Sequence, residues 1–440
     1  MNSKIILNKI VNFINENYLN YILLTILFIS LQTVLSPLLS LFLSDEIELS
    51  PINFIQDIYI SKKIIIIFIL TTFPLLLIYY FFNSYNFNKL KNNFSYLNIF
   101  KISLLIFISI IIYKVTRFFL YQNLGIFYLI KSHYLYILLF SSSLIMYFES
   151  NKKIYLLLSI LIFFQFLLLS NGNRANLITM VFIIMYFNSK FLNKHFLINS
   201  LTVLLFLIFI LPINYSLKCR SENGNCFKNI FYDMKNFKNI YEDQYNRCLI
   251  KEKEYCLINT IGKLYSDTTI ARVVQLHNIN KVIYTEDKKI REKFENNKNI
   301  ISDTLEVNPF FNKIFKMFNL KNLSSNIQLS GNEIGRMLNI ISLKDRTTGI
   351  AIPTFIDLYE KFGYYSVIFF SFLVGVLLLI FKNSLNHNLL FFFSPFFFVK
   401  TIHSMENYFV SFLSNIIDLT ILFFIFYIIL SIMNKFSKNE

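Results

Sequence analysis

Long apolar runs, separated by short polar stretches, make up most of this 440-residue chain. A helix needs about 20 mainly apolar residues to cross the hydrocarbon core of a membrane. Ten runs are predicted to be transmembrane helices: residues 18–43, 64–83, 99–119, 125–148, 154–170, 175–192, 196–214, 364–381, 389–403 and 407–432. The pattern therefore predicts an all-α integral membrane protein with about ten transmembrane helices.

One polar segment, residues 215–363, separates the seventh predicted span from the eighth. The chain then divides into spans 1–7 (1–214), this large loop, and spans 8–10 with a short tail (364–440). Apolar residues recur at helical spacing in three parts of the loop, which are predicted to be amphipathic helices. These parts are residues 266–279, 332–341 and 353–362.

The last of these helices directly precedes a predicted span. Its apolar stripe consists of Phe355, Leu358, Tyr359 and Phe362. The opposing charged side consists of Asp357, Glu360 and Lys361. Such a helix is expected to lie flat on the membrane surface. Gly363 is expected to end it and to let the chain turn into the next span.

Basic residues in the short connections indicate the orientation, because cytoplasmic connections are enriched in Lys and Arg. With a cytoplasmic N-terminus, the inside connections and span edges hold twelve basic residues and the outside connections hold three. The twelve are Lys4, Lys9, Lys89, Lys91, Lys101, Lys152, Lys153, Lys190, Lys194, Lys382, Lys435 and Lys438, and the three are Lys62, Lys63 and Arg174. Both termini are therefore predicted to be cytoplasmic, and residues 215–363 to face outward.

Composition supports a membrane protein and narrows its partners. Hydrophobic residues make up 55% of the chain and charged residues 15%, a balance that soluble proteins rarely show. The net charge of +16 raises the possibility of nucleic-acid binding, but no nucleic-acid motif is present and none is expected as a partner. Nucleotide-binding, metal-clamp and serine-hydrolase motifs are also absent, so no cofactor or metal is expected.

All four cysteines lie in the predicted outward-facing segment, at positions 219, 226, 248 and 256. An oxidising compartment permits disulfides, and at least one is expected here. Three pairings are possible, and unpaired thiols are the alternative.

Several cationic residues are candidates for binding an anionic group. Arg174 ends the tight turn Ser170-Asn-Gly-Asn-Arg174 at the start of a predicted span, where its guanidinium could grip a phosphate with two hydrogen bonds. The alternative is an interface anchor. Charges within spans usually face a cavity, and a set at one outer depth indicates an anionic ligand. That set includes Arg117, Lys131, Lys400 and His403.

The loop adds further candidates. Arg272, Arg336 and Arg346 are predicted ligands of phosphate or sugar. Candidate general bases are Glu333, Asp357 and Glu360. In the alternative interpretation, Glu333 and Arg336 simply pair on a helix surface, since they are three residues apart. Asp418, inside the tenth predicted span, is expected to be an internal ion-pair partner.

Two stretches resemble the oligosaccharide repeat-unit polymerases, the Wzy-type O-antigen and capsule polymerases. Ser170-Asn-Gly-Asn-Arg174 is similar to the family's Ser-x-Gly-x-Arg turn. Thr348-Gly-Ile-Ala-Ile-Pro-Thr-Phe-Ile-Asp-Leu-Tyr-Glu-Lys-Phe-Gly363 is similar to its Pro-x-x-x-Glu/Asp-Leu-Tyr-x-x-Phe-Gly pattern after the large loop. Asp357 stands where the family more often has Gly-Glu.

The resemblance implies a glycosyltransferase of the bacterial inner (cytoplasmic) membrane. It would transfer an oligosaccharide from undecaprenyl pyrophosphate to the terminal sugar of a fresh lipid-linked repeat unit, with the bilayer and a chain-length regulator as candidate partners. Arg174, Arg272 and Arg336 would stabilise the pyrophosphate, and Glu360 or His403 would take the acceptor's proton. The implied substrate-binding residues are Arg117, Lys131, Arg346 and His403.

Two other functions stay open at this point. An O-antigen ligase, which moves the finished chain onto a lipid core, shares the architecture and is poorly separated by sequence. A flippase or transporter of lipid-linked oligosaccharides would carry out no chemistry. The large outward-facing segment argues against a transporter, and so does the lack of an internal repeat.

Overall fold

The computed structural model describes residues 19–37, 60–82, 94–120, 132–169, 174–191, 276–284, 352–382 and 387–436, together with residues 304, 308 and 311. Within these ranges the chain forms eleven α-helices and no β-strand. They are α2 (Tyr21–Gln32), α4 (Lys62–Phe82), α5 (Tyr96–Leu120), α6 (Ser132–Ser150), α7 (Lys153–Leu169), α8 (Arg174–Phe191), α14 (Leu276–Tyr284), α19 (Thr354–Phe362), α20 (Tyr364–Lys382), α21 (Asn388–Met405) and α22 (Phe409–Phe436). The predicted all-α class is confirmed for the described part.

Seven of the ten predicted spans coincide with helices to within a few residues: α4, α5, α7, α8, α20, α21 and α22. The first predicted span, 18–43, is represented by the shorter α2, because Thr33 leaves helical geometry at φ −116° and ψ −92°. The fourth span is described only as α6, from residue 132 onward. The seventh, 196–214, lies outside the described residues.

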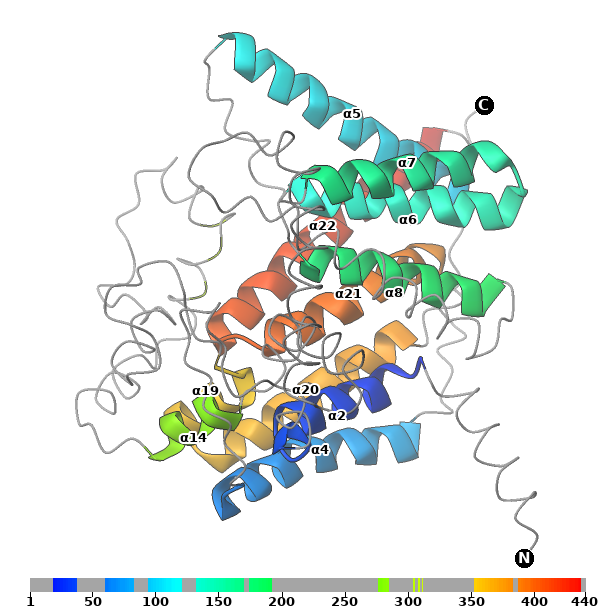
Figure 1. Cartoon of the computed structure of the whole chain (residues 1–440). Coiled ribbons are helices and arrows are strands. Elements are labelled where there is room, and N and C mark those ends of the chain that lie inside the picture. Colours follow the sequence, from blue (N-terminus) through cyan, green and yellow to red (C-terminus); the bar gives the residue numbers. More distant parts are fainter. Residues whose placement is uncertain are drawn as a thin grey trace, which may run out of the picture.

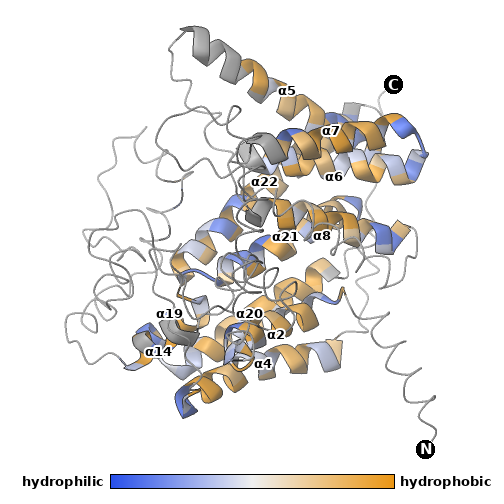
Figure 2. Ribbon diagram, in the orientation of Figure 1, coloured by the Kyte–Doolittle hydropathy of each residue, from blue (hydrophilic) through white to orange (hydrophobic). Residues whose placement is uncertain are grey.

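Three of the described helices are long and apolar enough to cross a membrane: Lys62–Phe82, Tyr364–Phe381 and Phe409–Lys435. Five shorter apolar helices accompany them. Large apolar side chains such as Phe73, Leu105, Phe369 and Phe424 are exposed on the outer faces of the bundle, where lipid would cover them. Figure 2 shows this apolar character along most of long helices such as α7 and α20. The chain is therefore a helical membrane protein, and the number of ten spans stays a prediction.

The helices pack side by side in an ordered series (Figure 1). At one side of the bundle α6 contacts both α5 and α7, and α8 lies between α6 and α21. At the other side α20 contacts α21, α2 and α4, while α22 pairs with α21. Segments from both ends of the sequence are thus neighbours, and α21 connects the two sides.

Aromatic side chains hold α2 and α21 together. Tyr21 is fully buried, its ring stacks on Phe398 at 4.4 Å between centroids, and its hydroxyl lies 2.7 Å from Ser394 Oγ. The Ser394 hydroxyl in turn donates to the Phe381 carbonyl of α20 at 3.1 Å. A buried tyrosine hydroxyl needs such a partner, because leaving it without one inside an apolar core is costly.

Gly375 lets α20 approach α4 closely. A Cβ atom added at this position would lie 2.5 Å from Ile78 Cδ1 and 3.2 Å from Leu75 Cδ2. Small residues allow this kind of close approach between membrane helices, whose association depends on tight packing. The glycine is therefore explained by packing against α4.

The α14 helix extends farther than predicted. The expected helix ended at Ile279, whereas α14 continues to Tyr284. Ile279, Val282 and Ile283 are buried and continue the helical spacing of apolar residues. Residues 266–275 lie outside the described residues.

Two features of α19 follow the prediction and one differs. The helix ends at Phe362, and Gly363 has a positive φ of 76°, a conformation that glycine adopts without steric cost. The predicted polar side is wrong for Asp357 and Lys361, which are 0% and 6% exposed, whereas Phe362 is 40% exposed. The reason is that α19 also contacts α21 and α22, which cover its charged side.

Candidate functional site

Polar residues of α19, of the end of α21 and of the start of α22 lie together at one end of the bundle, here called the α19 end. At this end α4, α20 and α22 begin and α21 finishes, and α19 packs against all four (Figure 1). Hydrophilic residues on α21 and α22 lie toward this end (Figure 2). The α14 helix also reaches it, since Lys63 Nζ of α4 lies 5.8 Å from the ring centroid of Tyr284.

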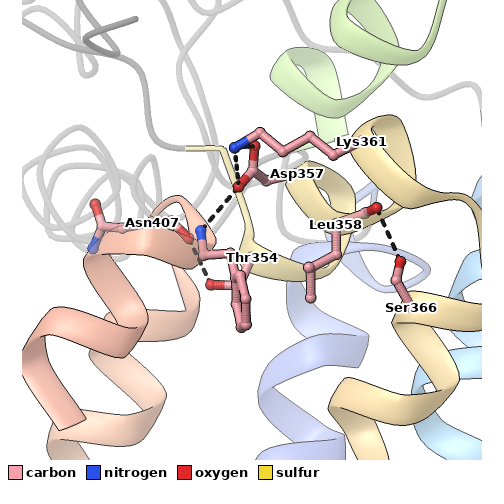
Figure 3. A network of polar contacts seen from close by, with 7 residues as sticks. Thr354, Asp357, Leu358, Lys361, Ser366 and Asn407 are labelled. Carbon is pink, nitrogen blue, oxygen red and sulfur yellow. Dashed lines mark hydrogen bonds and ion pairs between the residues drawn. The ribbon is translucent and has the colours of Figure 1, made fainter. Parts of the chain in front are cut away.

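Side chains of α19 fix the turn between α21 and α22 (Figure 3). The Thr354 hydroxyl donates to the Asn407 carbonyl at 2.6 Å and lies 3.4 Å from the Ser404 carbonyl. Asp357 Oδ2 accepts the backbone N–H of Phe409 at 3.0 Å. Helix ends leave such carbonyl and amide groups without intrahelical partners. Thr354 and Asp357 of α19 therefore supply hydrogen-bond partners at the end of α21 and at the start of α22.

Asp357 also forms a buried ion pair with Lys361, one helical turn later. Lys361 Nζ lies 3.0 Å from Asp357 Oδ1 and 3.1 Å from Asp357 Oδ2. The Lys361 side chain is 3% exposed and the Asp357 side chain is 0% exposed. Two opposite charges can be buried together because their attraction offsets part of the desolvation cost of each. Asp357, a candidate base from the sequence, thus pairs with Lys361 and holds α19 against the turn.

His403 and Glu406 form a second pair, at the end of α21. His403 Nδ1 lies 3.4 Å from Glu406 Oε2, and the side chains are 36% and 20% exposed. Asn407 Nδ2 donates to the His403 carbonyl at 3.2 Å, which adds a further bond within the turn. Sequence analysis missed Glu406. The available signal was an acidic residue three positions after a histidine at the end of a predicted helix, a spacing that brings side chains together.

The start of α8 lies level with the end of α21. Ring contacts between Phe182 and Phe398 (5.0 Å) and between Phe187 and Phe391 (5.6 Å) show that the two helices run antiparallel. Arg174 is eight residues before Phe182, which is about 12 Å along the helix axis toward the α19 end. The backbone of Arg174, the first residue of α8, therefore lies at the same level as the His403–Glu406 pair.

Glu360 completes the set of predicted site residues that can be located at this end. It lies in the last turn of α19 and is partly buried. The α19 helix contacts α21, which carries His403. The structure thus brings the elements bearing Arg174, Glu360 and His403 to one end, although they are far apart in the sequence.

Lys400 lies deeper and is buried. It is 6% exposed, and its Nζ sits 5.1 Å from the ring centroid of Tyr134 on α6. The hydrogen bond from Asn415 Nδ2 to Ser404 Oγ (3.0 Å) fixes the register of α21 against α22, so Asp418 is roughly level with Lys400. Lys400 therefore belongs to the interior of the bundle.

A residue of the 215–363 segment also reaches this interior. Asn308 is fully buried, and its Nδ2 lies 2.9 Å from Asp418 Oδ1 and 3.1 Å from the Ser414 carbonyl. An ion pair was expected for Asp418 and stays a prediction; the hydrogen bond from the Asn308 amide is one contact that its carboxylate makes.

The other predicted site residues are not described in atomic detail. Arg117 belongs to α5, but its side chain is outside the described set. Lys131, Arg272, Arg336, Arg346 and the four cysteines lie outside the described residues. Among the residues that are described, no group of three or more His, Cys, Asp or Glu could hold a metal ion.

No protein-family model matches the chain, and neither a curated protein nor a solved structure matches it. The function therefore rests on the residues, on their geometry at the α19 end, and on the two short motifs.

Proposed function

We propose that this protein polymerises lipid-linked oligosaccharide repeat units at the outer face of the bacterial inner membrane. The growing chain is transferred from undecaprenyl pyrophosphate to the terminal sugar of a new lipid-linked unit. Undecaprenyl pyrophosphate leaves, and the product stays attached to the lipid of the acceptor. The bond to pyrophosphate is already activated, so the reaction requires no nucleotide.

The observation that supports the proposal is that the helices carrying Arg174, Glu360 and His403 all reach the α19 end. These three residues come from α8, α19 and α21, and each was selected from the sequence for chemistry that this reaction needs. The bundle around them has apolar outer faces. A polar site at the end of such a bundle is suited to a substrate with a lipid tail and a sugar-phosphate head.

Charge stabilisation is the main requirement of the reaction. As the sugar–phosphate bond breaks, negative charge develops on the pyrophosphate, and fixed cations lower the barrier by binding that charge. We assign this role to Arg174, Arg272 and Arg336. We assign substrate binding to Arg117, Lys131, Arg346 and His403. A base must also take the proton of the acceptor hydroxyl, and Glu360 and His403 are the candidates.

The proposal requires the α19 end to face outward. The distribution of basic residues supports this orientation, because it predicts that α4, α20 and α22 enter the membrane from outside. Both termini are then cytoplasmic. The short connections at the opposite end, which carry most of the lysines, would face the cytoplasm.

Deletion of the gene in its own host tests the proposal against its nearest alternative, an O-antigen ligase. Loss of a polymerase should leave a single repeat unit on the lipid core. Loss of a ligase should leave no repeat unit there. A single-unit product that returns to a ladder on complementation supports polymerisation, and an unsubstituted core contradicts it.

A further inference from the structure

The His403–Glu406 pair has the geometry of a general base with an orienting carboxylate. We infer that His403 removes the acceptor's proton in the proposed reaction and that Glu406 is its positioning residue. This inference rests on the proposed function. It goes further by selecting one base from two candidates and by adding a residue that the sequence had not singled out.

The contact engages Nδ1 of the imidazole. With Nδ1–H directed at Glu406 Oε2, 3.4 Å away, the lone pair of the neutral ring resides on Nε2. The distance is longer than an ideal hydrogen bond, and catalytic contacts of this kind often tighten only when substrate binds. Both side chains are partly exposed, so a hydroxyl can approach them.

The pair stands on a turn that is held from several sides. Thr354 binds the Asn407 carbonyl, Asp357 binds the Phe409 N–H, and Asn407 Nδ2 binds the His403 carbonyl. A base contributes most when its position is fixed before the reaction, since no free energy is then spent on orienting it.

The proton and electron balance is simple. The acceptor oxygen forms a bond to the anomeric carbon of the donor sugar, while the bond from that carbon to the pyrophosphate oxygen breaks and its electron pair leaves with the pyrophosphate. The acceptor's proton moves to His403 Nε2. Glu406 stabilises the resulting imidazolium, which later releases the proton to water.

Chemical rescue tests this role. Purified His403→Ala, supplied with lipid-linked repeat units, should elongate chains about 10²–10⁴-fold more slowly than wild type, the usual contribution of a general base. Added imidazole should restore part of the lost rate, because it can occupy the space of the missing ring. A purely structural defect would not respond to imidazole.

Glu406→Gln should also be slow, and the double variant should be no slower than His403→Ala alone, because Glu406 acts through the histidine. His387→Asn is the matched control. His387 begins the same helix at the opposite end, where its Nδ1 accepts the Leu390 N–H, and asparagine preserves such a cap. The His387→Asn variant should elongate chains at the wild-type rate, and added imidazole should not change that rate.

The outcomes separate the two proposals. The base assignment alone is overturned if His403→Ala elongates chains at the wild-type rate. It is also overturned if the variant is slow and imidazole restores none of the lost rate. Additive losses in the double variant overturn the role of Glu406. If wild type itself forms no ladder, the proposed function fails and the base assignment fails with it.

Discussion

The buried Asp357–Lys361 pair gives the most direct test of how α19 is held. Replacing Lys361 by Met removes the cation and leaves the Asp357 carboxylate with the Phe409 N–H as its hydrogen-bond donor. Replacing Asp357 by Ala leaves both the Lys361 ammonium and that N–H without their acceptor. Breaking a buried ion pair from one side typically costs about 3–5 kcal/mol. We expect Lys361→Met near the lower figure and Asp357→Ala near the upper one.

The double variant should cost less than the sum of the two, because it leaves no isolated buried charge. The free energy of unfolding can be measured by titrating the purified protein in mixed micelles with a denaturing detergent. Lys62→Met is the control, since Lys62 is exposed at the start of α4 and its loss should change stability by no more than about 0.5 kcal/mol. If both single variants match this control, α19 is not packed as described and the explanation of the turn fails.

Three further predictions concern packing, the pyrophosphate site and orientation. Gly375→Ala should lower the free energy of unfolding by about 1–3 kcal/mol. Adding Ile78→Val deletes the Cδ1 atom 2.5 Å from the new Cβ and should recover much of this loss in the same unfolding titration. No recovery would argue against the contact between α20 and α4. In a chain-length assay at matched protein levels, Arg336→Ala should cost about 2.7–4 kcal/mol of transition-state stabilisation, and Arg336→Lys should lose less; an effect as mild as that of Glu333→Ala would mean that Arg336 only pairs with Glu333. Asn296→Cys should react with a membrane-impermeant thiol reagent in intact cells, after replacement of the four native cysteines; reaction only after permeabilisation would reverse the proposed orientation.

The sequence was sufficient to locate most of the described helices. Apolar runs of about 20 residues have one stable solution in a bilayer, so their length and composition predict helices directly. The end of α19 was predictable for a similar reason, since Gly363 is the residue best suited to the positive φ found there. Such features depend on local geometry and on the solvent.

Features that depend on tertiary contacts were missed. The pattern placed Asp357 and Lys361 on a solvated side, because periodicity cannot show that the α21–α22 turn covers them. The link from Asn308 to Asp418 joins residues 110 positions apart and leaves no local signal. Glu406 carried a weak signal, but its spacing from His403 acquires meaning only once α21 is known to extend to Met405.

The central claim is that the protein itself joins repeat units, and reconstitution tests it most directly. Purified protein in liposomes, supplied with undecaprenyl-pyrophosphate-linked repeat units as the only substrate and with no nucleotide sugar, should produce a ladder of lipid-linked chains that differ by one repeat. Release of undecaprenyl pyrophosphate should equal the number of linkages formed. A protein that moves the lipid-linked units across the bilayer, or leaves them unchanged, without forming any longer product would contradict the account.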